Sequence, residues 1–335
     1  MPSGVGNYRL GPFLLASEIP LSELQQLDDE AGPPDVTIRL GIAPERIENV
    51  VANESRWWAS REEYLLKVPN VATFFVRHGR EVTVQPAPGS LPGDVRAYLL
   101  SPIFSTLCYQ SGMYSLHASA IRVGDSVVAF VGDSGAGKST LAAYLRHRGY
   151  PIISDDFCLL DTRVGDPRSE TGPALVVPVA PALKLWRSAL EQLGGSPEDH
   201  PRVFSLDDKY RIRISPSTSV DARLPLREVL FLEWAEPKTA DGPQDADAID
   251  AGRDNDPALE TSFTRIEGVH AIARLMEFTH HDYLMKPTGR QTGSFLLCSR
   301  IMSQARAFAF RRPRDFGHID RVVDDLERHL ATIPA

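Results

Sequence analysis

Eight consecutive residues in the middle of the chain have the spacing of a phosphate-binding loop. They fit the pattern G-x-x-x-x-G-K-[ST] without a mismatch and are Gly132-Asp133-Ser134-Gly135-Ala136-Gly137-Lys138-Ser139. Glycines let backbone N–H groups turn inward around phosphate oxygens, Lys138 adds a positive charge, and Ser139 offers a hydroxyl to Mg2+. Together with the following Thr140, this segment is predicted to bind ATP and Mg2+.

Two carboxylates are predicted to lie beside this loop. Asp155 and Asp156 come seventeen residues after Lys138, at the end of the apolar run Tyr-Pro-Ile-Ile-Ser. One carboxylate can hold Mg2+ and another can accept the proton of an attacking hydroxyl. An Asp-Asp pair at a strand end can equally form a turn or a helix cap. Beside a phosphate loop, the pair favours phosphoryl transfer.

Basic residues supply candidates for contacts with the phosphoryl group or the acceptor. Lys209, Arg211 and Arg213 alternate along a predicted strand and therefore share one face. With Lys184 they could neutralise the transferring group or hold a carboxylate, although a solvated sheet face has the same pattern. Two further clusters are interpreted as surface groups because they lack companions at ligand spacing, namely residues 311–314 (Arg-Arg-Pro-Arg) and the pair His280-His281.

The elements around these residues predict an α/β fold. An apolar strand at 127–131 should precede the loop and a helix at 138–148 should follow it. Further strands are expected at 116–121, 150–154, 210–214 and 229–234, and a helix near 185–193. Residues 266–278, 292–303 and 319–330 are expected to form C-terminal helices that pack on the core.

The chain is predicted to contain two domains. Residues 60–86 have the composition of short strands, and the segment 86–93 holds three prolines and two glycines, which marks a linker. We therefore expect a β-rich N-terminal domain at 1–93, which could dock a peptide, and a second domain at 94–335. Six aspartates among small residues at 241–257 predict a disordered acidic insertion at 238–258.

Three of these segments together resemble a known family. The string Leu-His-Ala-Ser-Ala around His117, the loop GDSGAGKST and the run RGYPIISDD are similar, in register, to the catalytic core of HPr kinase/phosphorylases. The similarity spans residues 112–235 and implies a P-loop, PEP-carboxykinase-like fold. It also implies that Asp155 is the general base, that Asp156 helps to bind Mg2+ and that His117 assists. The HPr enzymes have an acidic residue where this chain has Thr140, so metal coordination is expected to differ.

The whole chain resembles a narrower group. HPr-kinase-like proteins encoded beside ribosomally made, modified peptides, lasso peptides among them, share the β-rich N-terminal region, a Lys-Leu-Trp segment and a basic strand. Here these last two are at 184–186 and 208–213. The resemblance implies a kinase that phosphorylates a serine of a precursor peptide. No counterpart of the arginine loop used for dephosphorylation is present, so phosphorylase activity is not expected. The HPr enzymes are hexamers, which leaves a homo-oligomer as an open alternative.

Composition argues against several other classes of protein. A net charge of −8 disfavours nucleic acid as a partner, and three widely spaced cysteines, Cys108, Cys158 and Cys298, are expected to be buried free thiols. The N-terminus lacks the pattern of an export signal, and no apolar run reaches the roughly 20 residues needed to span a bilayer, so we expect a cytoplasmic protein without membrane contact. Two alternative functions stay open: a kinase of a small metabolite, and a non-catalytic, nucleotide-binding regulatory protein.

Overall fold

The structure is a computed structural model that describes residues 4–28, 32–161, 174–179, 182–205, 207–214, 222–235, 260–284, 287, 289, 291–314 and 316–333. The predicted acidic insertion at 238–258 lies outside the described residues. Among them, none of the helices combines the length and the apolarity needed to cross a membrane. All three cysteines are buried and free, as expected.

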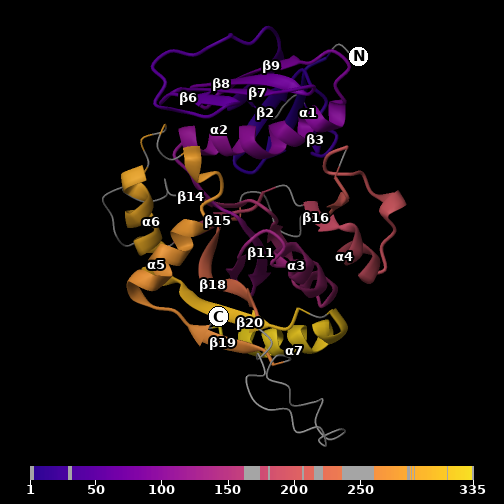
Figure 1. Cartoon of the computed structure of the whole chain (residues 1–335), viewed down its shortest axis with the longest axis vertical. Coiled ribbons are helices and arrows are strands. Elements are labelled where there is room, and N and C mark those ends of the chain that lie inside the picture. The colour runs from indigo at the N-terminus through magenta and orange to yellow at the C-terminus, as the bar shows by residue number, and fades with distance from the viewer. Residues whose placement is uncertain are drawn as a thin grey trace, which may run out of the picture.

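The N-terminal part of the chain forms one mostly antiparallel sheet, at the top of Figure 1, with the order β3-β1-β2-β4-β9-β8-β7-β6-β5. Its strands are β1 (Gly6–Leu10), β2 (Phe13–Ser17), β3 (Gln26–Leu27), β4 (Val36–Leu40), β5 (Ala52–Asn53), β6 (Trp57–Ala59), β7 (Glu63–Val68), β8 (Ala72–Arg77) and β9 (Glu81–Pro86). The turn between β8 and β9 contains His78 and Gly79, whose φ angles of 53° and 64° suit a tight hairpin. The two parallel pairs, β2 with β4 and β4 with β9, bring strands distant in sequence together.

A helical segment separates this sheet from a second one (Figure 1). It consists of α1 (Pro92–Tyr98), a π-helical turn η1 (Leu99–Ile103) and α2 (Phe104–Gln110). Pro92 lies in the first turn of α1, where its missing N–H has no helical partner to lose. Buried residues of this segment, among them Leu99 and Phe104, belong to an apolar core that continues into both sheets. The two sheets therefore share one core.

The second sheet carries the predicted phosphate loop. Its order is β10-β14-β15-β18-β12-β11-β13, and β20 extends it by pairing with β18 and β19. Its strands are β10 (Tyr114–Leu116), β11 (Ala118–Val123), β12 (Ser126–Val131), β13 (Ile152–Ser154), β14 (Cys158–Asp161), β15 (Leu175–Val177), β18 (Leu224–Trp234), β19 (Ser262–Arg265) and β20 (Arg306–Arg312). β12, β18 and β20 run parallel to one another. The fold is thus mixed α/β, as predicted.

Strand alternation gives this sheet two apolar faces. In β12, Val127, Ala129 and Val131 join the core shared with the N-terminal sheet, whereas Val128 and Phe130 face a second core. Buried residues of α3 and α7 cover that second face. The helices of this half are α3 (Lys138–His147), α4 (Arg187–Gln192), η2 (Pro197–Asp199), α5 (Gly268–Glu277), η5 (Asp282–Leu284), α6 (Gln291–Gln304), η6 (Phe316–His318) and α7 (Ile319–Leu330).

Most predicted elements are present, with two corrections. The helix after the loop and the three C-terminal helices are confirmed within a few residues. The expected helix near 185–193 begins only at Arg187, because β16 (Ala182–Trp186) first pairs with β17 (Lys209–Arg213). Residues 306–312, which hold two of the basic residues interpreted as surface groups, form strand β20 instead, and the side chain of Arg312 is buried.

Candidate active site

The segment 132–137 forms the turn between β12 and α3, the place that the motif requires. A Cβ on Gly132 would lie 3.2 Å from the carbonyl oxygen of Leu232. Gly137 has a φ of 81°, and a Cβ there would lie 2.9 Å from Arg312 Nη2. A side chain at either position would therefore require its neighbours to shift, and at Gly137 the left-handed φ would add strain. No side chain caps α3, so its first N–H groups are available to an anion.

Lys138 is buried beneath the loop. Its Nζ donates to the carbonyl oxygens of Gly132 (2.7 Å) and Asp133 (3.0 Å). Burial lowers the pKa of Lys138, the charges of Asp156 and Asp155 raise it, and the charge of Lys209 lowers it again. The charges of Asp155, Asp156 and Lys209, which come from two other segments of the chain, thus act on the ammonium group of Lys138.

Asp155 leaves the end of β13 with both carboxylate oxygens engaged. Its Oδ1 accepts a hydrogen bond from Ser119 Oγ at 2.6 Å, and its Oδ2 accepts one from the backbone N–H of Lys184 at 2.8 Å. These two donors fix the direction of the carboxylate. A carboxylate has about four lone-pair positions, so Asp155 can still accept a hydrogen bond from a further donor.

The side chain of Asp156 contacts different residues from those that contact Asp155. Its φ of 66° is in the left-handed region, which aspartate tolerates better than most residues and which turns its side chain away from that of Asp155. Lys184 Nζ lies 2.6 Å from Oδ2 and His117 Nδ1 lies 3.3 Å from Oδ1. Burial alone would raise the pKa of Asp156, but the charges of Lys184 and His117 outweigh it and hold the pKa well below its usual range.

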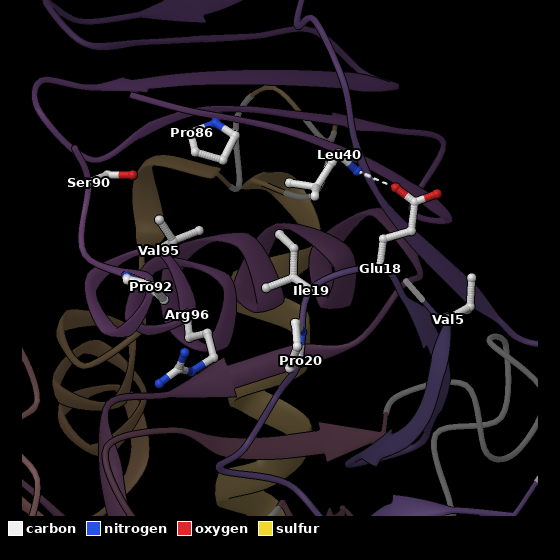
Figure 2. A pocket seen from close by; sticks show the side chains of 11 residues that line it. Val5, Glu18, Ile19, Pro20, Leu40, Pro86, Ser90, Pro92, Val95 and Arg96 are labelled. Carbon is white, nitrogen blue, oxygen red and sulfur yellow. Dashed lines mark hydrogen bonds between the residues drawn. The ribbon is translucent and has the colours of Figure 1, made fainter. Parts of the chain in front are cut away.

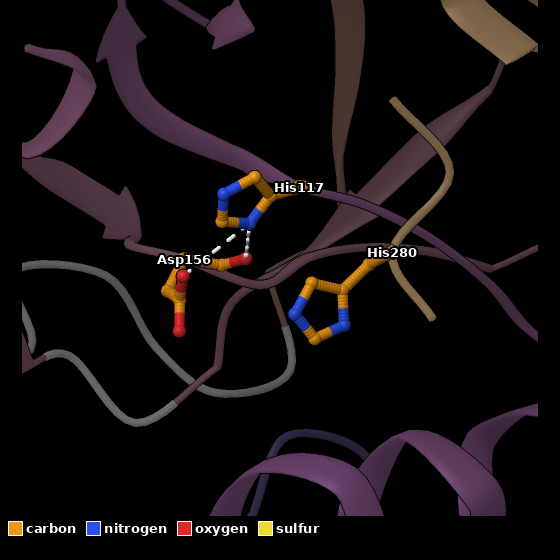
Figure 3. Close-up of side chains that lie close together, drawn as sticks. All are labelled: His117, Asp156 and His280. Atoms are coloured by element: carbon orange, nitrogen blue, oxygen red, sulfur yellow. Dashed lines mark hydrogen bonds and ion pairs between the residues drawn. The ribbon is translucent and has the colours of Figure 1, made fainter. Parts of the chain in front are cut away.

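His117 and His280 lie next to each other and to Asp156 (Figure 3). Their ring centroids are 5.5 Å apart, and the two rings are nearly parallel. The interpretation of His280 as a surface group was therefore wrong: its side chain is buried, because the segment after α5 pairs with β10 and its N–H donates to Ser115. Burial and the charge of Lys138 lower the pKa of His117, although Asp156 raises it.

One ligand atom each of His117, Asp156 and His280 could share a cation, since the three atoms lie within 4.8 Å of one another. Lys184 already pairs with the same carboxylate, and the positive charge of Lys138 is felt at His117. This positive surrounding disfavours a cation at the cluster unless negative ligands, such as the phosphates of a nucleotide, accompany it. The arrangement is better suited to holding the imidazole of His117 in place beside the acidic pair.

A cleft of about 280 Å³ opens beside these carboxylates. Residues of both halves of the molecule line it. From the second half come Asp155, Asp156, Lys184, Trp186, Lys209 and Arg211, and from the N-terminal half and the helical segment come Leu10, Glu23, Leu24, Ala97 and Phe104. Lys209 lies over the ring of Trp186, with Nζ 5.8 Å from the centroid. A molecule in this cleft would contact the acidic pair and a lysine at once.

The other two basic residues of β17 bind the N-terminal half of the chain. Arg211 Nη1 lies 2.8 Å from Glu23 Oε1, and Arg96 donates to the same carboxylate at 2.8 Å and 2.9 Å. Arg213 donates to the carbonyl oxygen of Ser22 at 2.6 Å. Of the predicted basic contacts, the structure thus brings Lys184 and Lys209 to the acidic pair, whereas Arg211 and Arg213 connect the two halves.

The residues present fit a magnesium nucleotide. Glycines that exclude side chains and uncapped N–H groups suit phosphate oxygens, and Ser139 follows Lys138 in the first turn of α3. A carboxylate has about four lone-pair positions, so Asp156 can bind a metal while it still accepts hydrogen bonds. Thr140 lies one residue further along α3, where the resemblance calls for an acidic group.

Comparisons with known proteins give little support. No protein-family model matches the chain, and no curated protein matches it. The structure of an HPr(Ser) kinase/phosphatase from Coxiella burnetii is similar to it at 11% identity and a TM-score of 0.27, over 64% of this chain and 89% of that one. The proposals below therefore depend on the site itself.

Several residues of the site carry no signal of their own in the sequence. Ser119 is one residue of the string around His117, and Glu23 lies more than 130 positions before the acidic pair. His280 reaches the site through a single antiparallel bridge between Leu116 and Thr279. The available hints were the strand predicted over 116–121, which contains Ser119, and a histidine just after the helix predicted over 266–278.

Proposed function

We propose that this protein is an ATP- and Mg2+-dependent kinase that transfers the γ-phosphoryl group to a serine hydroxyl of a peptide or small protein. One observation carries the proposal. The phosphate loop and the acidic pair follow strands β12 and β13, which both pair with β11 and end at the same edge of the sheet, and Ser119 of β11 donates to Asp155. Nucleotide phosphates on the loop would then lie beside a carboxylate able to accept a hydroxyl proton.

The side chains divide the work as follows. Asp155, oriented by Ser119 and by the N–H of Lys184, accepts the proton of the attacking hydroxyl. Lys138 and Lys209 stabilise the charge on the transferring group. Ser139 and Asp156 would hold Mg2+, which would supply positive charge to the phosphate oxygens. His117 and Lys184 keep the carboxylate of Asp156 in place.

The cleft supports a peptide as the acceptor, because both halves of the chain line it. A second, more apolar groove of about 550 Å³ lies between the N-terminal sheet and α1 (Figure 2) and is lined by Ile19, Leu40 and Val95 among others. Arg96 lines this groove and binds Glu23, which lines the cleft. The groove and the cleft therefore lie on either side of the ion pair between Arg96 and Glu23. We assign the groove to an apolar part of the acceptor peptide and the cleft to its serine.

The size of the cleft also favours a second candidate, a kinase of a small alcohol. A volume of about 280 Å³ is at the lower end of small-molecule pockets and would enclose such a substrate without help from the groove. The groove separates the two candidates. A peptide kinase should lose peptide affinity when the groove is altered, whereas a metabolite kinase should not.

Intact-mass measurement tests the proposal directly. The protein, ATP and Mg2+ are incubated with a panel of serine peptides that includes short peptides encoded beside its gene, and Lys138→Ala and Asp155→Asn are run alongside. A gain of about 80 Da that both variants lose is the expected result. ATP binding without any gain would contradict a peptide kinase and would favour a metabolite acceptor or a regulatory nucleotide site.

A further inference from the structure

Three parallel strands end at the edge of the sheet from which the phosphate loop leaves. In the pairing of β12, β18 and β20, Val131 lies opposite Phe231, and Trp234 lies opposite Arg312. The loop begins directly after Val131. The ends of β18 and β20 therefore run past the start of the loop and place Trp234 and Arg312 beside it. Ligands of parallel sheets bind at this carboxyl edge.

Arg312 is a buried cation without an acidic partner. Only 3% of the residue is exposed, and among the described residues no carboxylate pairs with it. Its guanidinium donates to the carbonyl oxygens of Ala136, within the phosphate loop, and of Glu233. Burial lowers the pKa of Arg312 to about 10. A buried charge is costly unless an opposite charge lies near it, and an anion on the adjoining loop would supply one.

Trp234 presents a flat surface next to the same loop. The guanidinium carbon of Arg312 is 4.1 Å from a ring centroid of Trp234, and that of the exposed Arg314 is 5.9 Å away. A Cβ on Gly137 would lie 3.6 Å from the indole, so the ring borders the last glycine of the loop. Thr140 lines the same hollow. The guanidinium of Arg314 and the indole of Trp234 thus lie beside the end of the loop where phosphates would bind.

We infer that Trp234 and Arg314 form the subsite for the base of a purine nucleoside triphosphate whose phosphates occupy the loop. The inference rests on the proposed function only in assigning phosphates to that loop. The hollow itself holds about 30 Å³, room for one water, so the base lies across its rim against the indole and the guanidinium. Bases stack well on tryptophan and arginine, and a purine offers the larger surface.

This subsite would determine which phosphoryl donor the protein prefers. An inorganic polyphosphate could use the loop, Lys138 and the charge of Arg312 but would gain nothing from stacking on Trp234. A nucleotide uses both. The chain should therefore bind ATP and GTP more tightly than CTP, and all three more tightly than inorganic tripolyphosphate, at equal Mg2+.

Calorimetric titration of ATP and of inorganic tripolyphosphate into four proteins tests the inference. They are the unaltered chain, Trp234→Leu, Trp234→Phe and, as a tryptophan control in the N-terminal sheet, Trp58→Leu. Trp234→Leu should weaken ATP binding about tenfold and leave tripolyphosphate binding unchanged. Trp234→Phe should keep most of the ATP affinity, and Trp58→Leu should keep all of it.

Two outcomes overturn the inference. In the first, Trp234→Leu binds ATP as the unaltered chain does. In the second, it loses ATP and tripolyphosphate equally, which would make Trp234 a support of the loop. If Trp234→Leu does not fold, the exposed Arg314→Gln replaces it, with a severalfold loss expected for ATP relative to tripolyphosphate. Failure of the unaltered chain to bind ATP would overturn the proposed function as well, so the two failures can be told apart.

Discussion

The phosphate loop and the neighbouring cleft obtain their residues in different ways. The loop consists of consecutive residues between β12 and α3, and its geometry depends on two strands, β12 and β18, that pair along their length. The cleft gathers Glu23, Asp155, Lys184 and Lys209 from four distant segments and from both halves of the chain. Substitutions that weaken the contacts between the two halves should therefore leave nucleotide binding intact but reduce the rate of phosphoryl transfer.

The largest effect is expected at the loop. Lys138→Ala should lower turnover about a thousandfold and weaken ATP binding, because it removes a charge aimed at the phosphates. Folding should persist, since Lys138 Nζ donates only to two backbone carbonyls. Phosphate gain by the peptide measures turnover, and Lys67→Ala in the N-terminal sheet is the matched control. Turnover within tenfold of normal would remove Lys138 from the mechanism.

The next effect separates the cleft from the loop. Asp155→Asn should lower turnover about a hundredfold or more, because an amide cannot accept the hydroxyl proton, while ATP affinity stays within twofold.

Asp156→Asn should instead raise the Mg2+ concentration needed for half-maximal rate, since it weakens a metal ligand and frees Lys184. Single-turnover rates and magnesium titrations measure both. A larger loss of chemistry from Asp156→Asn than from Asp155→Asn would exchange the two roles.

The same contrast explains what the sequence could reveal. Consecutive spacing identified the loop, and strand and helix periodicity predicted the elements on either side of it. His280 was misread because its burial depends on a bridge between residues 116 and 279, which no local pattern encodes. Arg312 was misread because a run of arginines resembles a surface cluster, although consecutive strand residues point to opposite faces, so that Arg311 is exposed and Arg312 is buried. The local elements were predictable from the sequence, and the contacts between distant segments were not.

His280 provides a test of such a supporting contact. His280→Gln should lower turnover about tenfold without changing ATP affinity, because the ring packs beside His117 and its Nδ1 lies 3.2 Å from Ser105 Oγ on α2. His147→Gln, at the exposed end of α3, is the control. Steady-state rates with ATP binding measured in parallel distinguish a positioning role from a defect of the loop. Equal losses of turnover and of ATP affinity would contradict the positioning role.

Glu23 tests whether the cleft depends on the contact between the two halves. Burial alone would raise the pKa of this carboxyl, but the hydrogen bond from Arg96 and the charge of Arg211 outweigh it, so the pKa falls below its ordinary value of 4.5. A lowered pKa contributes stability that is present above the pKa of the unfolded chain and is lost as pH falls through the folded pKa. Glu23→Gln should thus cost on the order of 2 kcal/mol at pH 7, and progressively less as pH falls below 4.5.

Urea unfolding at pH 7 and at pH 3 to 4 measures this difference for Glu23→Gln. Glu48→Gln, in the same half of the chain, is the control because Glu48 is exposed. At pH 7 the Glu23 variant should keep its ATP affinity and lose turnover. A stability difference that does not change with pH would show that the ion pair contributes nothing through its charge.

The smallest effect is expected in the groove of the N-terminal half, and it decides between the two acceptor classes. Leu40 lines the groove and is 46% exposed, whereas Ile42, two residues later, is 88% exposed and is not part of the lining. Leu40→Asp should raise the KM for a peptide severalfold and leave the KM for ATP unchanged, because an apolar contact is replaced by a charge. Ile42→Asp should change neither constant. Since both substitutions add one negative charge to the same surface, a general electrostatic effect would appear in both. An equal KM for the two variants would therefore show that the groove does not contact the acceptor, and a small molecule confined to the cleft would then be the better substrate.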